Sequence, residues 1–154
     1  HTRMGAHRST MTPVGIRERT NILICPEYGI FCSNSEGQKD RFASWWVDIF
    51  GVSLTERTAF LCEVTYSQSM QGIVRRLVQW HERWDDVRKA ISLKSGVPDD
   101  WPIQPWVFAP ETLIPIFNKR LAKLIPTPRF PEPIVTPLER TVPWLASAAK
   151  PSEP

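Results

Sequence analysis

The stretch Phe42–Tyr66, FASWWVDIFGVSLTERTAFLCEVTY, decides the fold that we expect for this chain. Its two halves, Phe42–Leu54 and Thr58–Tyr66, are rich in aromatic and β-branched residues, a composition typical of β-strands. The short, more polar segment between them predicts a β-hairpin. The turn lacks the Asn-Gly signal of the tightest hairpins, so the turn alone does not determine the register of the two strands.

The hairpin brings two acidic residues together. A two-residue turn at 55–56 pairs Leu54 with Arg57, and the same register places Asp48 directly opposite Glu63. Opposite residues share a face, with Cβ atoms about 4.5–5.5 Å apart. Carboxylates that close repel each other unless a positive charge lies between them. Mg²⁺ or Mn²⁺ is the natural candidate, because a bound metal takes oxygen ligands and can activate a water. Alternatively, both side chains point to solvent, or a one-residue slip separates them.

The flanking segments predict helices and further strands. Apolar residues recur at three- and four-residue intervals over Ser67–Leu93 and Glu111–Ile125, which predicts two amphipathic helices. Short apolar runs predict buried strands at Ile22–Ile24 and Trp106–Ala109, and Pro26 either ends the first strand or marks a sheet edge. Helices that follow strands favour a mixed α/β class, with a small central mixed sheet flanked by helices.

Length and proline content predict the domain organisation. A chain of 154 residues that is 42% hydrophobic favours one domain with a real core, and we place it at residues 11–124. Residues 1–10 have no apolar pattern and are interpreted as a remnant of expression. More than half of the fifteen prolines fall in residues 125–154. We therefore expect that segment to be a linker, or a tail that binds a protein partner.

Charge, hydropathy and cysteine content argue against several classes of protein. The formal net charge is +3, but without Arg3 and Arg8 the chain has 17 basic and 16 acidic residues. Net charge is therefore no argument for nucleic-acid binding. No apolar run reaches the length of a transmembrane helix, so no membrane association is expected. The odd number of cysteines and their spacing support neither a disulfide framework nor a zinc site. The plain expectation is reduced thiols in a cytoplasmic protein, at Cys25, Cys32 and Cys62.

At these residues the chain resembles the PD-(D/E)XK nuclease superfamily, which has the restriction-endonuclease-like fold. In that family an Asp on one strand and a Glu-x-Lys on the next hold a metal and activate water, and a helix and a further strand follow. Here the corresponding residues are Val47-Asp48, Glu63-Val64-Thr65 and a helix from about Ser69. The resemblance covers about Phe42–Ala109, less than half of the chain. It implies a metal-dependent nuclease in which Asp48 and Glu63 hold Mg²⁺ or Mn²⁺.

Two positions depart from the family motif. Val47 replaces the usual proline, and Thr65 stands where the lysine is expected. That lysine helps to position the water and stabilises phosphate charge. Another polar residue near the start of the helix could replace it, and the candidates are Gln68, Gln71 and Arg75. The resemblance also implies an additional acidic residue, for which Glu27 and Glu36 are the candidates.

Basic residues on the first helix could contact nucleic acid. Basic side chains can neutralise backbone phosphates, and the set comprises Arg75, Arg76, Arg83, Arg88 and Lys89. Acidic residues are interleaved with them, so an ordinary solvated helix face is the alternative. His81 has no second histidine at helical spacing and is interpreted as a surface or boundary residue. Trp80 and Trp84 lie on the apolar face and are interpreted as core residues.

Three function classes remain open. The first is a metal-dependent nuclease acting on DNA or RNA, or a degenerate relative that kept the fold. The second is a non-catalytic interaction module whose proline-rich tail binds a protein. The third is a small-molecule α/β enzyme, which no glycine-rich phosphate loop, nucleophile elbow or Cys/His pair supports. The placement of Asp48 and Glu63 favours the first, and Thr65 favours the second.

Overall fold

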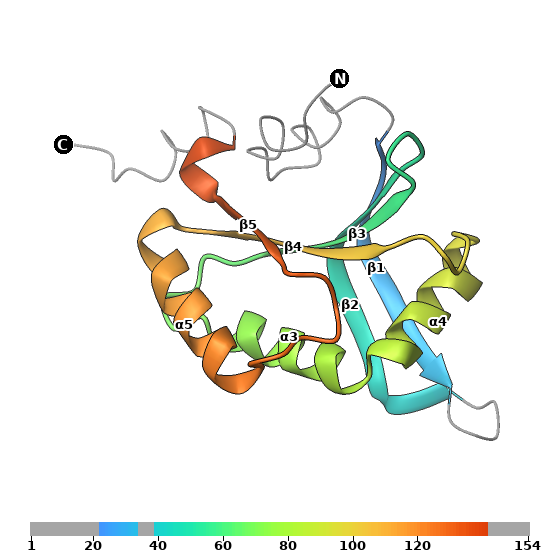
Figure 1. Ribbon diagram of the computed structural model, residues 1–154, viewed down its shortest axis with the longest axis horizontal. Helices are drawn as coiled ribbons and strands as arrows, with labels where there is room; N and C mark the ends of the chain where they lie inside the picture. Colours follow the sequence, from blue (N-terminus) through green and yellow to red (C-terminus); the bar gives the residue numbers. More distant parts are fainter. Residues whose placement is uncertain (1–21, 34–38, 142–154) are drawn as a thin grey trace.

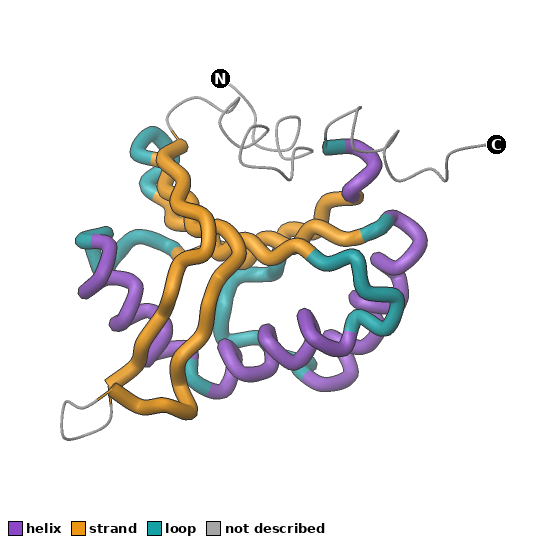
Figure 2. The backbone as a smooth tube through the Cα atoms, turned by 180° about the vertical axis from the view of Figure 1, so that it is seen from behind, coloured by secondary structure: helices purple, strands orange, loops and turns teal. Residues whose placement is uncertain are grey.

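The computed structural model describes residues 22–33 and 39–141 and confirms a mixed α/β fold (Figure 1). A five-stranded mixed sheet crosses the molecule, and the α-helices of the described part pack on one of its faces, as Figure 2 shows from behind. The elements in chain order are β1 (Ile22–Ser33), β2 (Lys39–Ser53), β3 (Thr58–Val64), α3 (Gln71–Glu82), α4 (Trp84–Ser95), β4 (Ile103–Ala109), η1 (Glu111–Leu113), α5 (Ile114–Leu124), β5 (Ile134–Pro137) and η2 (Leu138–Arg140).

The strands follow one another across the sheet in the order β1-β2-β3-β4-β5. The first three form an antiparallel meander, and β4 runs parallel to both β3 and β5. The predicted hairpin and its register are confirmed, because Ser53 pairs with Thr58 and Ile49 pairs with Cys62. The turn is longer than predicted, since residues 54–57 all lie outside the strands.

Strand β1 is longer than the predicted Ile22–Ile24 and continues through Pro26, which lies opposite Ile49 of β2. The prediction that Pro26 ends the strand is therefore wrong, and the alternative, a sheet edge, agrees with the order of the described strands. Among the described strands β1 pairs with β2 alone, so a residue without an amide hydrogen can sit there without breaking their ladder.

The single helix predicted for Ser67–Leu93 is wrong. Two helices, α3 and α4, meet at Arg83, whose φ of −120° and ψ of 30° are not helical. The two helices have different neighbours, because α3 packs beside α5 whereas α4 packs on β1. Helix α3 also begins later than predicted, because Met70 has a left-handed φ of 56° and buries its side chain completely. No helix within the described ranges is long and apolar enough to cross a membrane.

The strand predicted at Trp106–Ala109 is confirmed as part of β4, which begins earlier and includes Pro105. Pro105 pairs with Leu61 of β3, but pairing with β5 begins only at the next residue, Trp106. The missing amide hydrogen therefore lies where β4 has one neighbour among the described strands. The helix predicted for Glu111–Ile125 is confirmed as η1 followed by α5.

The proline-rich segment is not a tail over its whole length. Ile125 and Phe130 are only 2% and 4% exposed, and β5 adds a parallel strand beside β4. The expectation of a linker outside the core is therefore wrong for residues 125–141. Prolines do not prevent packing here, because the apolar residues between them reach the core. Residues 142–154 lie outside the described part of the chain.

Both faces of the sheet carry apolar clusters. The larger one lies under the helices and includes Trp80 and Trp84, which confirms that both are core residues. On the opposite face, Trp106 stacks on Phe108 with ring centroids 5.0 Å apart. Cys62 is buried in that second cluster, where it acts as a small apolar residue.

Candidate functional site

The site predicted by the sequence lies where β2 and β3 separate. Their ladder runs from Ser53 to Ile49 on β2. Beyond it, β2 continues beside β1 alone, while Glu63 and Val64 of β3 pair with β4. Asp48 and Glu63 therefore lie at the point of separation, which we call the fork.

The two carboxylates connect the strands at the fork. The backbone N–H of Asp48 donates to Oε2 of Glu63 at 2.9 Å, and the backbone N–H of Val64 donates to Oδ2 of Asp48 at 2.8 Å. Each side chain therefore accepts a hydrogen bond from the backbone of the other strand. Asp48 is exposed, whereas Glu63 is only 4% exposed. The pair thus presents one carboxylate to solvent and one to the interior.

Glu63 is held by a positive charge from the helix that follows. An Nη atom of Arg76 on α3 lies 2.5 Å from Oε1 of Glu63. Burial nevertheless raises the pKa of Glu63 from 4.5 to about 8, although the nearby charge of Arg76 acts in the opposite direction. The ionised form is costly because water cannot solvate it. Even beside Arg76, Glu63 is therefore mostly protonated at neutral pH, and a second cation at the fork would favour its ionised form.

Sequence reasoning gave Arg76 only a role in phosphate contact and missed this ion pair. One signal was present: Arg76 lies three residues after Ile73 and four before Trp80, both buried, so it belongs to the apolar stripe of the helix. A cation in such a stripe needs a buried acceptor. The partner of Arg76 could not be predicted from helical spacing, because Glu63 lies on a different element.

The residues proposed around the missing lysine do not gather at the fork. Thr65 accepts a hydrogen bond at Oγ1 from the backbone N–H of Ser67 at 3.1 Å, which forms a local turn. Gln68 and Gln71 are exposed. Among the described residues, no hydrogen bond or ion pair joins any of these three candidates to Asp48 or Glu63.

The remaining candidates lie elsewhere. Arg83 forms an ion pair with Asp86 at 2.6 Å, and Arg75 is exposed on α3. His81 is half-buried, and its Nδ1 accepts a hydrogen bond from the backbone N–H of Arg129 at 3.2 Å. That position is consistent with the boundary residue predicted. Neither the side chain of Glu27 nor any part of Glu36 belongs to the described structure.

The donor set at the fork is small. Within the described ranges, no group of three or more His, Cys, Asp or Glu side chains is placed to hold a metal. Mg²⁺, however, is often bound by one or two carboxylates together with waters and substrate phosphates. Asp48 is exposed to solvent and accepts the backbone N–H of Val64 at Oδ2. Both carboxylate oxygens of Glu63 already accept hydrogen bonds, from the backbone N–H of Asp48 and from Arg76, so a divalent cation here would share Glu63 with these donors and take its other ligands from water or substrate.

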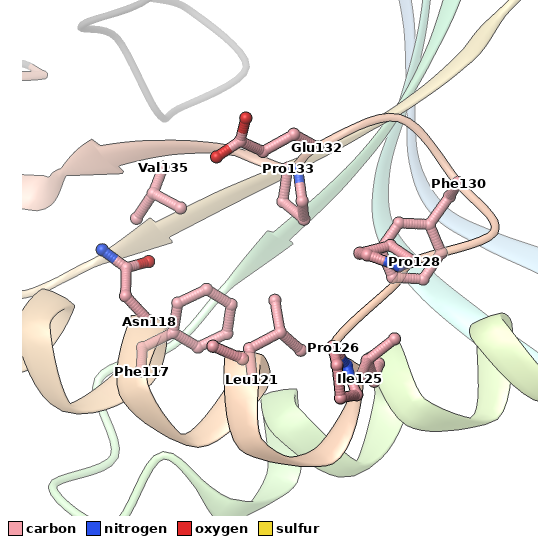
Figure 3. Close-up of a pocket in the computed structure, with 11 residues that line it drawn as sticks. Phe117, Asn118, Leu121, Ile125, Pro126, Pro128, Phe130, Glu132, Pro133 and Val135 are labelled. Carbon is pink, nitrogen blue, oxygen red and sulfur yellow. The ribbon is translucent and has the colours of Figure 1, made fainter.

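A separate hollow of about 820 Å³ lies between α5 and residues 125–135 (Figure 3). Phe117, Leu121 and Phe130 form much of its apolar wall, and Asn118 and Glu132 also line it. No residue of the fork contributes to it. The hollow is therefore not part of the predicted site.

Comparison of the chain with family models, curated proteins and solved structures finds no match.

Proposed function

We propose that this chain is a nuclease-like domain of the PD-(D/E)XK type that hydrolyses phosphodiester bonds with Mg²⁺ or Mn²⁺ bound by Asp48 and Glu63. The observation that carries the proposal is the fork, where one exposed and one buried carboxylate meet on adjacent antiparallel strands. The order of elements is compatible with it, because a hairpin is followed by helices and a parallel strand.

Arg76 takes the role of the missing motif lysine in this proposal. Its guanidinium contacts Oε1 of Glu63, and its side chain is 31% exposed, so a phosphate entering the fork can reach it. A guanidinium stays protonated at all relevant pH values, so Arg76 stabilises negative charge and cannot act as a base. A bound divalent cation supplies the Lewis acidity and the acidified water.

Metal binding in this proposal is coupled to proton release. Glu63 must be ionised to bind a cation, and its pKa is raised to about 8 by burial. A ligand carboxyl that is protonated beforehand releases its proton when a metal binds. Affinity for Mn²⁺ should therefore increase as the pH rises from 6 to 8.

The test combines thermal melts with a cleavage assay. At a hundredfold excess over Kd, a metal that binds only the folded state adds about 2.7 kcal/mol, which for a domain of this size raises Tm by roughly 5–15 °C. We expect Mn²⁺ to raise the Tm of the wild type and to support cleavage of labelled DNA or RNA. Glu63→Gln should abolish both effects. The control is Glu111→Gln, an exposed residue paired with Arg140, which should behave as wild type.

A second candidate function is favoured by the same ion pair. Arg76 already contacts Glu63, and Thr65 is engaged in a turn, as expected of a relative that kept the fold and lost cleavage. Such a protein would act as a non-catalytic interaction module. Mn²⁺ binding without cleavage would indicate a binding-only relative. If Mn²⁺ has no effect on the wild type, the metal-dependent function is wrong.

A further inference from the structure

A groove between α3 and α5 collects positive charge with no acidic counterpart. It has a volume of about 540 Å³ and is lined by Val74, Val78 and Leu124 together with three polar side chains, Gln71, Arg75 and Arg120. No carboxylate lines it. Sequence reasoning identified Arg75 but not Arg120, because the latter comes from a helix far away in the sequence.

These two arginines differ from most others in the described chain. Within residues 22–33 and 39–141, neither Arg75 nor Arg120 forms an ion pair. The one hydrogen bond in which either takes part there runs from Arg120 to the carbonyl oxygen of Ser69, which fixes the guanidinium and leaves most of its five N–H donors free. Four other arginines of the described ranges do form ion pairs with carboxylates, in the pairs Arg76–Glu63, Arg83–Asp86, Arg129–Asp85 and Arg140–Glu111.

We infer that this groove binds the phosphate backbone of a single-stranded nucleic acid and guides it to the fork, an inference that rests on the proposed nuclease-like function. Arg75 and Arg120 each take a backbone phosphate. A guanidinium is the side chain best suited to phosphate, because its donors can bind two oxygens at once. Charge complementarity identifies the ligand as an anion, since the groove offers two guanidinium groups and no carboxylate.

The position of the groove connects it to the fork. Arg75 lines the groove and the next residue, Arg76, contacts Glu63, so the two places lie on neighbouring sides of one helix. A helix with its side chains is about 10–12 Å across. A few nucleotides of an extended single strand can span that distance. One strand can therefore contact the groove and the fork together.

The shape and lining of the groove indicate which parts of the strand it contacts. It is a shallow, open groove between two helices, and we expect a flexible single strand to follow it more closely than a rigid duplex. No aromatic side chain lines it, so bases do not stack there. The contacts go to phosphates alone and carry no sequence information. Binding should therefore depend on salt and little on base sequence.

The experiment measures binding of a fluorescent 20-nucleotide oligothymidylate by anisotropy, with EDTA present so that no cleavage occurs. Each phosphate contact with a single strand contributes about −0.7 to the slope of log K against log salt. The double variant Arg75→Ala/Arg120→Ala should bind at least tenfold more weakly, with a slope reduced in magnitude by about 1.4. Arg140→Ala removes the same kind of charge from an exposed ion pair and should stay within twofold of wild type. Circular dichroism melts verify that each variant is folded.

Several outcomes would overturn the inference. The first is that the wild type fails to bind the oligonucleotide at 50 mM salt. The second is that the double variant binds it as well as Arg140→Ala does. The third is that the wild type binds a duplex of equal length more tightly than the single strand, and that this binding depends on the same arginines. Equal competition by polyglutamate that depends on the same arginines would assign the groove to an acidic peptide instead. Glu63→Gln separates the two proposals. Retained binding with lost cleavage supports both, whereas binding by a wild type that never cleaves removes only the nuclease proposal.

Discussion

Glu63 should make the stability of the whole domain depend on pH. Its side chain is buried, accepts the backbone N–H of Asp48 and contacts Arg76. Burial raises its pKa from 4.5 to about 8. In the unfolded chain the carboxyl is solvated and titrates at its ordinary value. Between these two values the folded state binds a proton that the unfolded state does not.

The sign and size of the effect follow from that difference. A state that binds more protons is favoured at low pH, so stability falls as the pH rises from about 4.5 to about 8. The slope is at most about 1.4 kcal/mol per pH unit. Between pH 5 and pH 8 the loss amounts to roughly 3–4 kcal/mol. For a domain of this size it lowers Tm by on the order of 10 °C.

Urea unfolding at pH 5, 6, 7 and 8 measures this directly, with Glu63→Gln as the test variant. Glutamine keeps the shape but not the charge, so the part of the slope due to Glu63 should vanish. The substitution also places an amide where two donors point at the carboxylate, which costs about 1–3 kcal/mol at every pH. Glu111→Gln, on an exposed side chain, should retain the wild-type slope.

Two results would refute this reasoning. One is a wild type whose unfolding free energy does not decrease between pH 5 and pH 8. The other is a Glu63→Gln variant with the same slope as wild type, because the slope would then come from other titrating groups. Saturating Mn²⁺ provides a further check, since a cation bound to ionised Glu63 should flatten the wild-type slope.

The packing of the C-terminal segment gives three more expectations. Deleting residues 125–154 should leave no cooperative unfolding transition by circular dichroism, because β5 and its buried neighbours are lost. Phe130→Ala should cost about 3–5 kcal/mol in urea unfolding, whereas Ile116→Ala, at an exposed side chain, should cost far less. Thr136→Val should cost about 1–3 kcal/mol, because it leaves the buried indole N–H of Trp106 without its acceptor; a neutral effect would mean that the indole finds another partner.

The pairing of the hairpin strands could be predicted because it depends on residues that are close together in the sequence. The strands and their turn lie within a few residues of one another, so composition and turn position fix the pairing. That local information was enough to place Asp48 and Glu63 on adjacent strands. It was also enough to identify the amphipathic helices, whose apolar spacing records which side of each helix faces inward.

The tertiary structure alone decided which elements the inward-facing sides of these helices pack against. The break at Arg83 reflects two different neighbours for α3 and α4, and neither is visible in helical spacing. The proline-rich segment reads as extended by composition, yet Phe130 packs against Trp84 with ring centroids 5.4 Å apart. Composition describes the average behaviour of a segment, whereas a few apolar residues decide whether it finds a core.

The tertiary structure alone also decided which charged groups lie next to one another. Arg76 meets Glu63, and Arg120 shares a groove with Arg75, across separations that no local pattern encodes. A periodic pattern specifies the orientation of a side chain within its own element. The fold determines which element lies opposite, and therefore which charges are neutralised and which are left to bind a ligand.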